Sequence, residues 1–132
     1  AVWVPNRNGV LLNAAAAWAE ANGADRILFG ANREEAEAGF PDNTAEYRQR
    51  LNAALAMSTM NRVQVEAPVE HLDKDAIVAL GQRLGAPLHL VWSCYEAGER
   101  HCGVCASCRY LKRASERYGL GIPFLVQEAP SS

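Results

Sequence analysis

The four cysteines of the chain constrain its fold more than any other feature, because they follow the pattern C-x7-C-x2-C-x2-C between residues 94 and 108. Four thiolates make a complete tetrahedral ligand set for zinc, with no position left for water. Two residues between ligands let a tight turn aim two sulfur atoms at one ion, and a glycine suits such a turn. The pattern therefore predicts a closed, structural zinc site made of Cys94, Cys102, Cys105 and Cys108.

Disulfides and an iron–sulfur cluster are the two alternatives to a zinc site for these four cysteines. Disulfides are disfavoured, because the spacings are too short for a stapling framework and nothing else in the chain is typical of a secreted protein. An iron–sulfur cluster is the main alternative, since C-x2-C-x2-C also opens the bacterial ferredoxin pattern. That pattern continues with a fourth cysteine and a proline, whereas here Arg109 follows and the fourth cysteine lies upstream. His101 borders Cys102 and is a competing ligand type, but four cysteines already fill the site.

Composition predicts one globular domain with one core. The chain has 132 residues, of which 49% are hydrophobic, and its formal net charge is −2. No apolar run approaches the length of a membrane span and no signal peptide opens the chain, so we expect a cytoplasmic protein without a membrane partner. The charge gives no case for direct nucleic-acid binding, and the basic residues near the cysteines are interpreted as a solvated helix face.

The order of the predicted elements is typical of an α/β protein with a parallel sheet. Strands are predicted over residues 2–4, 26–31 and 63–68, and helices over 10–22, 45–60, 71–81 and 108–118. The run 26–31 is continuously apolar, as in strands buried on both faces of a sheet. Residues 122–126 are predicted to be extended. We expect three parts: an α/β part (1–91), a cysteine segment with its helix (92–118) and a tail (119–132).

Two features indicate ligand binding. The polar segment 32–44 follows the carboxyl end of a predicted strand, where open α/β sheets keep their ligand crevice, although a plain surface loop explains it equally well. Lys74 lies in the first turn of a helix with Asp73 as its N-cap, where the macrodipole disfavours a cation. Such a lysine suits an anion such as phosphate, or it simply points into water. No Walker or dinucleotide glycine loop and no nucleophilic triad is present.

Several short motifs resemble, in the same order, those of the 7-cyano-7-deazaguanine synthase family, from residue 2 to about residue 118. The most specific are Trp92-Ser-Cys-Tyr95 and Cys102-Gly-Val-Cys-Ala-Ser-Cys108. The weaker ones are Val4-Pro-Asn-Arg-Asn8, Gly30-Ala-Asn32, Phe40-Pro-Asp42, Ala67-Pro68 and Leu72-Asp-Lys74.

The resemblance implies an adenine nucleotide alpha hydrolase-like (ATP-pyrophosphatase) fold, present in part, with a C-terminal four-cysteine zinc-binding segment. It implies an enzyme that uses ATP with magnesium to activate the carboxylate of 7-carboxy-7-deazaguanine. Ammonia then converts the activated acid through an amide to the nitrile, in queuosine and archaeosine biosynthesis. A homodimer is usual for the family. The four cysteines match the family's zinc ligands.

The resemblance also implies roles for five other residues. Arg7 and Asn8 are expected to contact nucleotide or phosphate, and Lys74 becomes a phosphate-binding cation. Asn32 and Asp42 are expected to face the deazapurine or its carboxylate. The family often has tyrosine and cysteine where this chain has Phe40 and Asn43, so the substrate contacts differ in detail.

The family's glycine-rich pyrophosphate loop, serine-glycine-glycine-x-aspartate-serine, is absent from these residues. The resemblance therefore covers the C-terminal part of such an enzyme, and we expect a missing N-terminal portion as partner and no activity of this chain alone. A sheet that lacks its central strands is expected to expose strand edges and apolar faces.

Two further functions stay open. One is an ATP-pyrophosphatase that thiolates tRNA, in which the cysteines would hold an iron–sulfur cluster and the basic helix 109–117 would contact RNA. The other is a zinc-stapled module without catalytic activity, if the pyrophosphate loop is truly absent.

Overall fold

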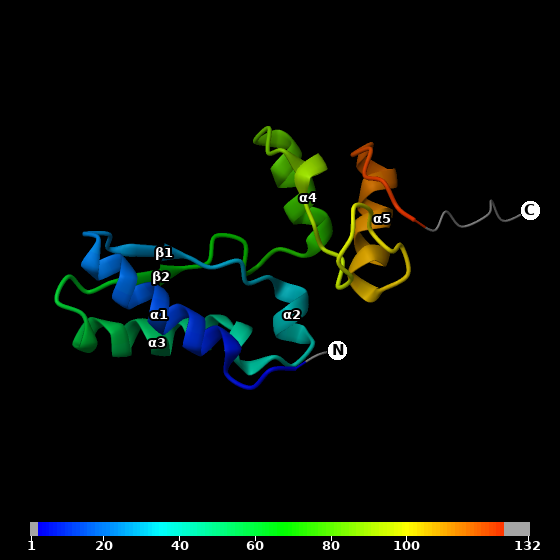
Figure 1. Cartoon of the computed structure of the whole chain (residues 1–132). Coiled ribbons are helices and arrows are strands. Elements are labelled where there is room, and N and C mark those ends of the chain that lie inside the picture. The colour runs from blue at the N-terminus through cyan, green and yellow to red at the C-terminus, as the bar shows by residue number, and fades with distance from the viewer. Residues whose placement is uncertain (1–2, 126–132) are drawn as a thin grey trace, which may run out of the picture. The chain divides into compact units, whose positions relative to one another are not determined.

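The computed structural model describes residues 3–125, and the chain divides into two compact units, residues 1–73 and 74–132. The first unit contains α1 (Arg7–Ala21), β1 (Arg26–Leu28), α2 (Arg33–Glu37), the 3-10 helix η1 (Pro41–Asn43), α3 (Ala45–Ser58) and β2 (Gln64–Glu66) (Figure 1). The second contains α4 (Lys74–Arg83), the 3-10 helix η2 (Leu88–Leu90) and α5 (Ala106–Tyr118). The predicted part boundaries at residues 91 and 118 stay a prediction. Within the described range, no helix has the length and apolar content needed to cross a bilayer.

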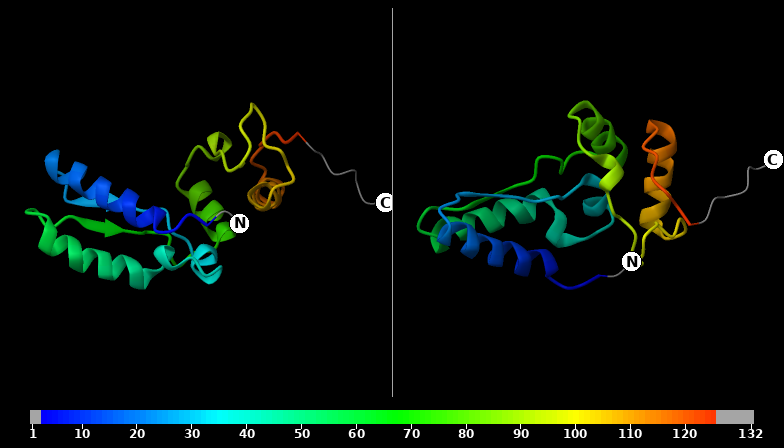
Figure 2. Two further views of the ribbon diagram at one scale, coloured as in Figure 1. Left: turned by 60° about the horizontal axis from the view of Figure 1, so that its bottom comes forward. Right: turned by 45° about the horizontal axis from the view of Figure 1, so that its top comes forward.

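The first unit is built on a parallel pair of strands, which confirms the α/β class and the parallel pairing. β1 and β2 pair in a register that places Ile27 opposite Val65. Helices α1 and α3 lie side by side on one face of this pair (Figures 1 and 2). The core lies between helices and strands, with Val63 and Val65 fully buried. The other core residues are Leu12, Ala16, Ala19, Leu51 and Leu55.

The opposite face of the strand pair is exposed. Leu28 is 73% exposed, so the prediction that the run 26–31 is buried on both faces is wrong. The reason is that both covering helices of this unit lie on the other face, and the strand itself ends at Leu28. The outer side of α1 is exposed as well, with Val10 at 63% and Trp18 at 67%. The expectation of exposed apolar faces is thereby confirmed.

The outer edge of β2 is closed by a side chain from α3. Asn52 donates from Nδ2 to the carbonyl of Val65 at 3.0 Å and accepts from the amide of Val65 at 2.7 Å. A carboxamide here stands in for a neighbouring strand, because it satisfies both backbone groups that Val65 turns away from β1. Within the described residues, the sheet therefore has its open edge at β1.

Helix α1 begins three residues earlier than predicted. Its N-cap residue, Asn6, has φ 54° and makes no capping hydrogen bond with its own side chain. The cap comes instead from Asp42, whose Oδ2 accepts from the backbone amide of Asn8 at 3.0 Å. A cap supplied from 34 residues away leaves no local sequence signal.

The predicted first strand, residues 2–4, is not found in the described part. Trp3 and Val4 lie in no strand, and Val2 lies outside the described residues. Trp3 stacks on Phe40 instead, with ring centroids 5.7 Å apart and planes 10° from parallel. This contact joins the start of the chain to the segment before η1.

The polar segment 32–44 contains two short helices. Asn32 caps α2, since its Oδ1 accepts from the amide of Glu35 at 3.1 Å. Thr44 caps α3 in the same way, through the amide of Tyr47 at 3.1 Å. Side-chain caps at both places explain why a loop rich in turn formers has a defined course.

The second unit pairs α4 with α5 (Figure 1). Gln82 Nε2 donates to the carbonyl of Tyr118 at 2.7 Å, and Arg117 forms an ion pair with Asp75. After α5 the chain turns back at Gly119, which has φ 63°, as expected for a helix C-terminus. Of residues 122–125, Phe124 forms an isolated bridge and Leu125 lies in a bend, so the extended tail stays a prediction; Val126 lies outside the described residues.

Candidate metal centre

The four cysteines come from two stretches of the second unit. Cys94 follows η2, Cys102 and Cys105 lie in the turn that leads into α5, and Cys108 lies in the first turn of that helix. Gly103 has φ 79°, a value that favours glycine and that the turn between Cys102 and Cys105 requires. The predicted role of a glycine after Cys102 is confirmed by this angle.

The sulfur atoms of these cysteines have the separation of a metal ligand set. All four lie within 4.8 Å of one another, and Cys102 Sγ is 3.8 Å from Cys108 Sγ. Sulfur atoms about 2.3 Å from a zinc ion at tetrahedral corners lie about 3.8 Å apart. All four cysteines are free thiols, so the disulfide interpretation fails for them.

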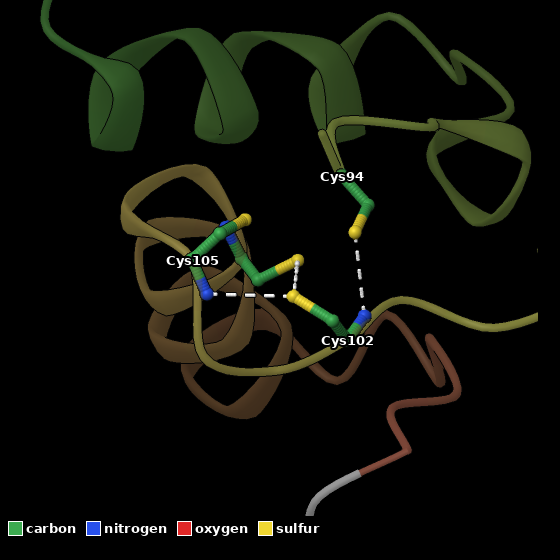
Figure 3. A group of neighbouring side chains, drawn as sticks. Cys94, Cys102 and Cys105 are labelled. Atoms are coloured by element: carbon green, nitrogen blue, oxygen red, sulfur yellow. Dashed lines mark hydrogen bonds between the residues drawn. The ribbon is translucent and has the colours of Figure 1, made fainter. Parts of the chain in front are cut away.

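Backbone amides donate hydrogen bonds to the sulfur atoms, and Figure 3 shows those that reach the sulfur atoms of Cys94 and Cys102. The amide of Cys102 donates to Cys94 Sγ at 3.4 Å, and the amide of Cys105 donates to Cys102 Sγ at 3.4 Å. The amide of Cys108 donates to Cys105 Sγ at 3.3 Å, which also makes Cys105 the N-cap of α5. Amide donors stabilise thiolates, the form of cysteine that binds metal.

The thiols differ in how readily they lose a proton. The backbone hydrogen bond from Tyr95 lowers the pKa of Cys105 to about 6. The backbone hydrogen bond from Cys102 lowers the pKa of Cys94. Burial raises the pKa of Cys108 to about 12. A cation bound between the sulfur atoms would offset that desolvation, because it supplies the positive charge that a buried thiolate lacks.

Donor chemistry and geometry therefore fit a metal ion. Four sulfur ligands in a tetrahedral arrangement are typical of zinc or of iron–sulfur sites, and the set leaves no position for water or substrate. The cluster can hold an ion such as zinc, and the bound ion would link Cys94 to the start of α5.

His101 lies beside the cluster, where the sequence alone indicates only a competing ligand type. Its side chain is 3% exposed, with Nε2 3.2 Å from the carbonyl of Val91 and Nδ1 4.0 Å from Cys108 Sγ. Sequence reasoning missed this supporting position. The one available signal was adjacency to Cys102.

Three of the predicted ligand-binding residues lie together in the first unit. Asn8 and Asp42 are buried and joined by two hydrogen bonds, the second from Asn8 Nδ2 to the carbonyl of Asp42 at 3.3 Å. Arg7 Nε and Nη2 both donate to Asn8 Oδ1 at 3.3 Å.

Tyr47 lies beside this group and was not predicted as a site residue. Burial and the Asp42 charge raise the pKa of its hydroxyl. Its hydroxyl would lie 2.7 Å from a Cβ at Gly9, so Gly9 leaves room for it.

The other two predicted residues lie elsewhere. Asn32 caps α2 through Glu35, as described above. Lys74 belongs to the second unit, where its Nζ lies 4.7 Å from the ring centroid of Tyr110, and Arg113 lies 4.8 Å from the same centroid. Two cations against one aromatic ring form a basic surface on this helix pair.

The sequence matches the family described as "Queuosine biosynthesis protein QueC" over residues 1–119. It is 55% identical over 118 residues to a protein of Desulforudis audaxviator named 7-cyano-7-deazaguanine synthase, covering 89% of this chain and 53% of that protein. Proteins of the same name from Carboxydothermus hydrogenoformans and Methanosarcina mazei are 54% and 47% identical, covering 86% and 95% of this chain and 52% and 54% of theirs. The chain thus spans about half the length of the curated relatives it matches. It belongs to the QueC family of queuosine biosynthesis proteins, of which it matches the C-terminal part.

Proposed function

We propose that this chain is the C-terminal part of an ATP-dependent synthase that makes 7-cyano-7-deazaguanine from 7-carboxy-7-deazaguanine and ammonia. The observation that carries this proposal is the 55% identity to a synthase of that name over 118 residues. The match includes all four cysteines, whose sulfur atoms have metal-ligand separations.

The chemistry requires two activations per product. A carboxylate oxygen attacks the α-phosphate of ATP, pyrophosphate leaves, and ammonia displaces AMP to give the amide. The amide oxygen must then also leave, and a second adenylation removes it with AMP to give the nitrile. Converting a carboxylic acid and ammonia to a nitrile removes two oxygen atoms, so two ATP are consumed. Positive charge and magnesium at the phosphates stabilise these steps more than a general base does.

Roles for the predicted residues are proposed from the resemblance to the family. Arg7 lies at the N-terminus of α1 and, with Asn8, is proposed to contact the nucleotide phosphates, since helix N-termini and guanidinium groups both favour anions. Asn32 and Asp42 are proposed to face the deazapurine or its carboxylate. Lys74 is proposed to bind a phosphate from the first turn of α4.

The zinc proposed for the four cysteines is structural. When bound, it supplies a cross-link between residue 94 and the start of α5, and no step of the reaction uses it. The cysteines themselves then serve as ligands and as helix caps, not as nucleophiles.

An N-terminal portion is proposed to complete the enzyme, because the pyrophosphate loop of such synthases is absent from this sequence. Such a portion would pair with the open edge of β1, whose backbone groups can form hydrogen bonds. It would also cover the exposed apolar surface at Leu28 and on the outer side of α1. The chain alone is then inactive. The complete enzyme is proposed to be a homodimer.

The test is an assay of the complete gene product with ATP, magnesium, ammonia and 7-carboxy-7-deazaguanine. Mass spectrometry should detect the nitrile, with two AMP formed for each nitrile. Lys74→Ala should raise the KM for ATP, while Arg83→Ala, an exposed cation in the last turn of the same helix, should not. AMP formation without the deazapurine acid, or no nitrile at all, would contradict the proposal.

A further inference from the structure

The segment that follows α5 folds back and pairs with His101, the residue before Cys102. The amide of His101 donates to the carbonyl of Pro123 at 3.4 Å, and the amide of Leu125 donates to the carbonyl of His101 at 2.8 Å. His101 and Phe124 thus form a parallel bridge, one residue before Cys102. Both backbone groups of His101 are held by the returning chain.

The side chains reinforce this bridge. The His101 ring stacks on Trp92, with centroids 4.5 Å apart, and lies against Phe124, with centroids 5.4 Å apart. Trp92 lies two residues before Cys94 and His101 one residue before Cys102. The aromatic group therefore joins the two stretches that carry the cysteines. The imidazole also contacts Cys108 Sγ through Nδ1 at 4.0 Å.

The returning segment has its own anchor on α5. Ile122 is 7% exposed, and its amide lies 3.4 Å from the Ser115 hydroxyl, which accepts the hydrogen bond. Ser115 is itself buried in the second half of the helix. The segment is thus bonded to Ser115 through Ile122 and to His101 through Pro123 and Leu125. These bonds hold Phe124 against the imidazole from the residues on either side of it.

We propose that residues 121–125 act as a clasp for the metal centre, with His101 and Phe124 as positioning residues that slow release of the bound ion. The inference rests on the metal site proposed above. A metal ion with four ligands would dissociate as the ligands detach from it one after another. The clasp opposes this, because the Trp92–His101–Phe124 stack holds the stretches that carry Cys94 and Cys102 together. Outer-shell partners of metal ligands typically contribute 10- to 100-fold to metal affinity.

The test measures metal content and then the rate of zinc transfer to a chromogenic chelator, using the complete gene product. Phe124→Ala should keep one zinc per chain but release it about 10- to 100-fold faster. Phe124→Tyr should restore the slow rate, since it keeps the ring. His101→Phe keeps the stack but loses both ring-nitrogen contacts, and it should shift the cobalt(II) absorption bands of the substituted site.

Leu125→Ala is the matched control, because that side chain is 65% exposed and its backbone amide still donates to His101. Equal release rates for the parent, Phe124→Ala and Leu125→Ala proteins would overturn the clasp while leaving the metal site intact. A parent protein without bound metal would instead refute the metal site itself. The two failures are therefore distinguishable.

Discussion

Asp42 caps helix α1 from a distance, accepting the backbone amide of Asn8 at 3.0 Å although 34 residues separate them. Asn8 is also proposed to contact the nucleotide phosphates, and Asp42 to face the deazapurine or its carboxylate. Burial of both residues means that this contact is part of the fold of the first unit, whatever else the carboxylate does.

Replacing Asp42 should therefore reduce stability. Asp42→Ala leaves the buried amide of Asn8 without an acceptor, which is expected to cost about 1–3 kcal/mol in the free energy of unfolding. Urea denaturation measures it. Asp42→Asn keeps an acceptor oxygen and should lose less. Equal stabilities for Asp42→Ala and the parent would show that the cap is not needed.

The Arg48–Glu70 pair should make stability depend on pH. Two hydrogen bonds of 2.7 and 2.8 Å join the guanidinium to the carboxylate, and both side chains are only 20% exposed. The hydrogen bond from Arg48 lowers the pKa of Glu70 below its ordinary 4.5. The stabilisation is therefore fully present above the unfolded-state pKa and is lost as pH falls through the lower folded-state pKa.

Glu70→Gln should reduce the free energy of unfolding at pH 7 by about 1–2 kcal/mol and remove this part of its acid dependence. Glu46→Gln is the control: Arg50 also donates two hydrogen bonds to Glu46, both to Oε1, but these side chains are 78% and 72% exposed. It should change stability by less than about 0.5 kcal/mol. Identical acid profiles for the Glu70→Gln and parent proteins would refute the role assigned to this half-buried pair.

Asn52 should protect the sheet from pairing at its outer edge. Asn52→Leu leaves the amide and carbonyl of Val65 unsatisfied and should both destabilise the first unit by about 1–3 kcal/mol and promote aggregation. Light scattering and denaturation measure the two effects. Asn13→Ala is a suitable control, since Asn13 Nδ2 donates to the carbonyl of Gly9 within its own helix. Similar behaviour of the two variants would argue against edge protection.

Losing one cysteine ligand should unfold its segment. Cys105→Ser is expected to remove the metal and with it the order of the segment, because the binding free energy of such a site is folding free energy. A serine hydroxyl can still cap α5, so any loss of order comes from the lost ligand and not from the cap. Hydrogen exchange across residues 92–118 should then rise to the rate of an unfolded peptide. Metal loss with unchanged exchange would contradict a structural role.

Sequence reasoning predicted that the four cysteines come together, and their sulfur atoms do lie within 4.8 Å of one another, because short spacings limit what a tight turn can bring together. It failed where partners are distant in the chain. The start of α1 depends on Asp42, and the surroundings of His101 depend on Phe124, which no local pattern relates to it. The burial expected for Leu28 was wrong because an apolar strand pattern says nothing about whether both faces are covered. The roles proposed for Arg7, Asn8, Asn32, Asp42 and Lys74 stay predictions.

Elemental analysis of the purified chain tests the four-cysteine metal centre most directly. We predict one zinc ion per chain, tetrahedral sulfur coordination by X-ray absorption, and no zinc after Cys105→Ser. Iron with inorganic sulfide in place of zinc, or full-length folded protein with no metal bound, would contradict the account.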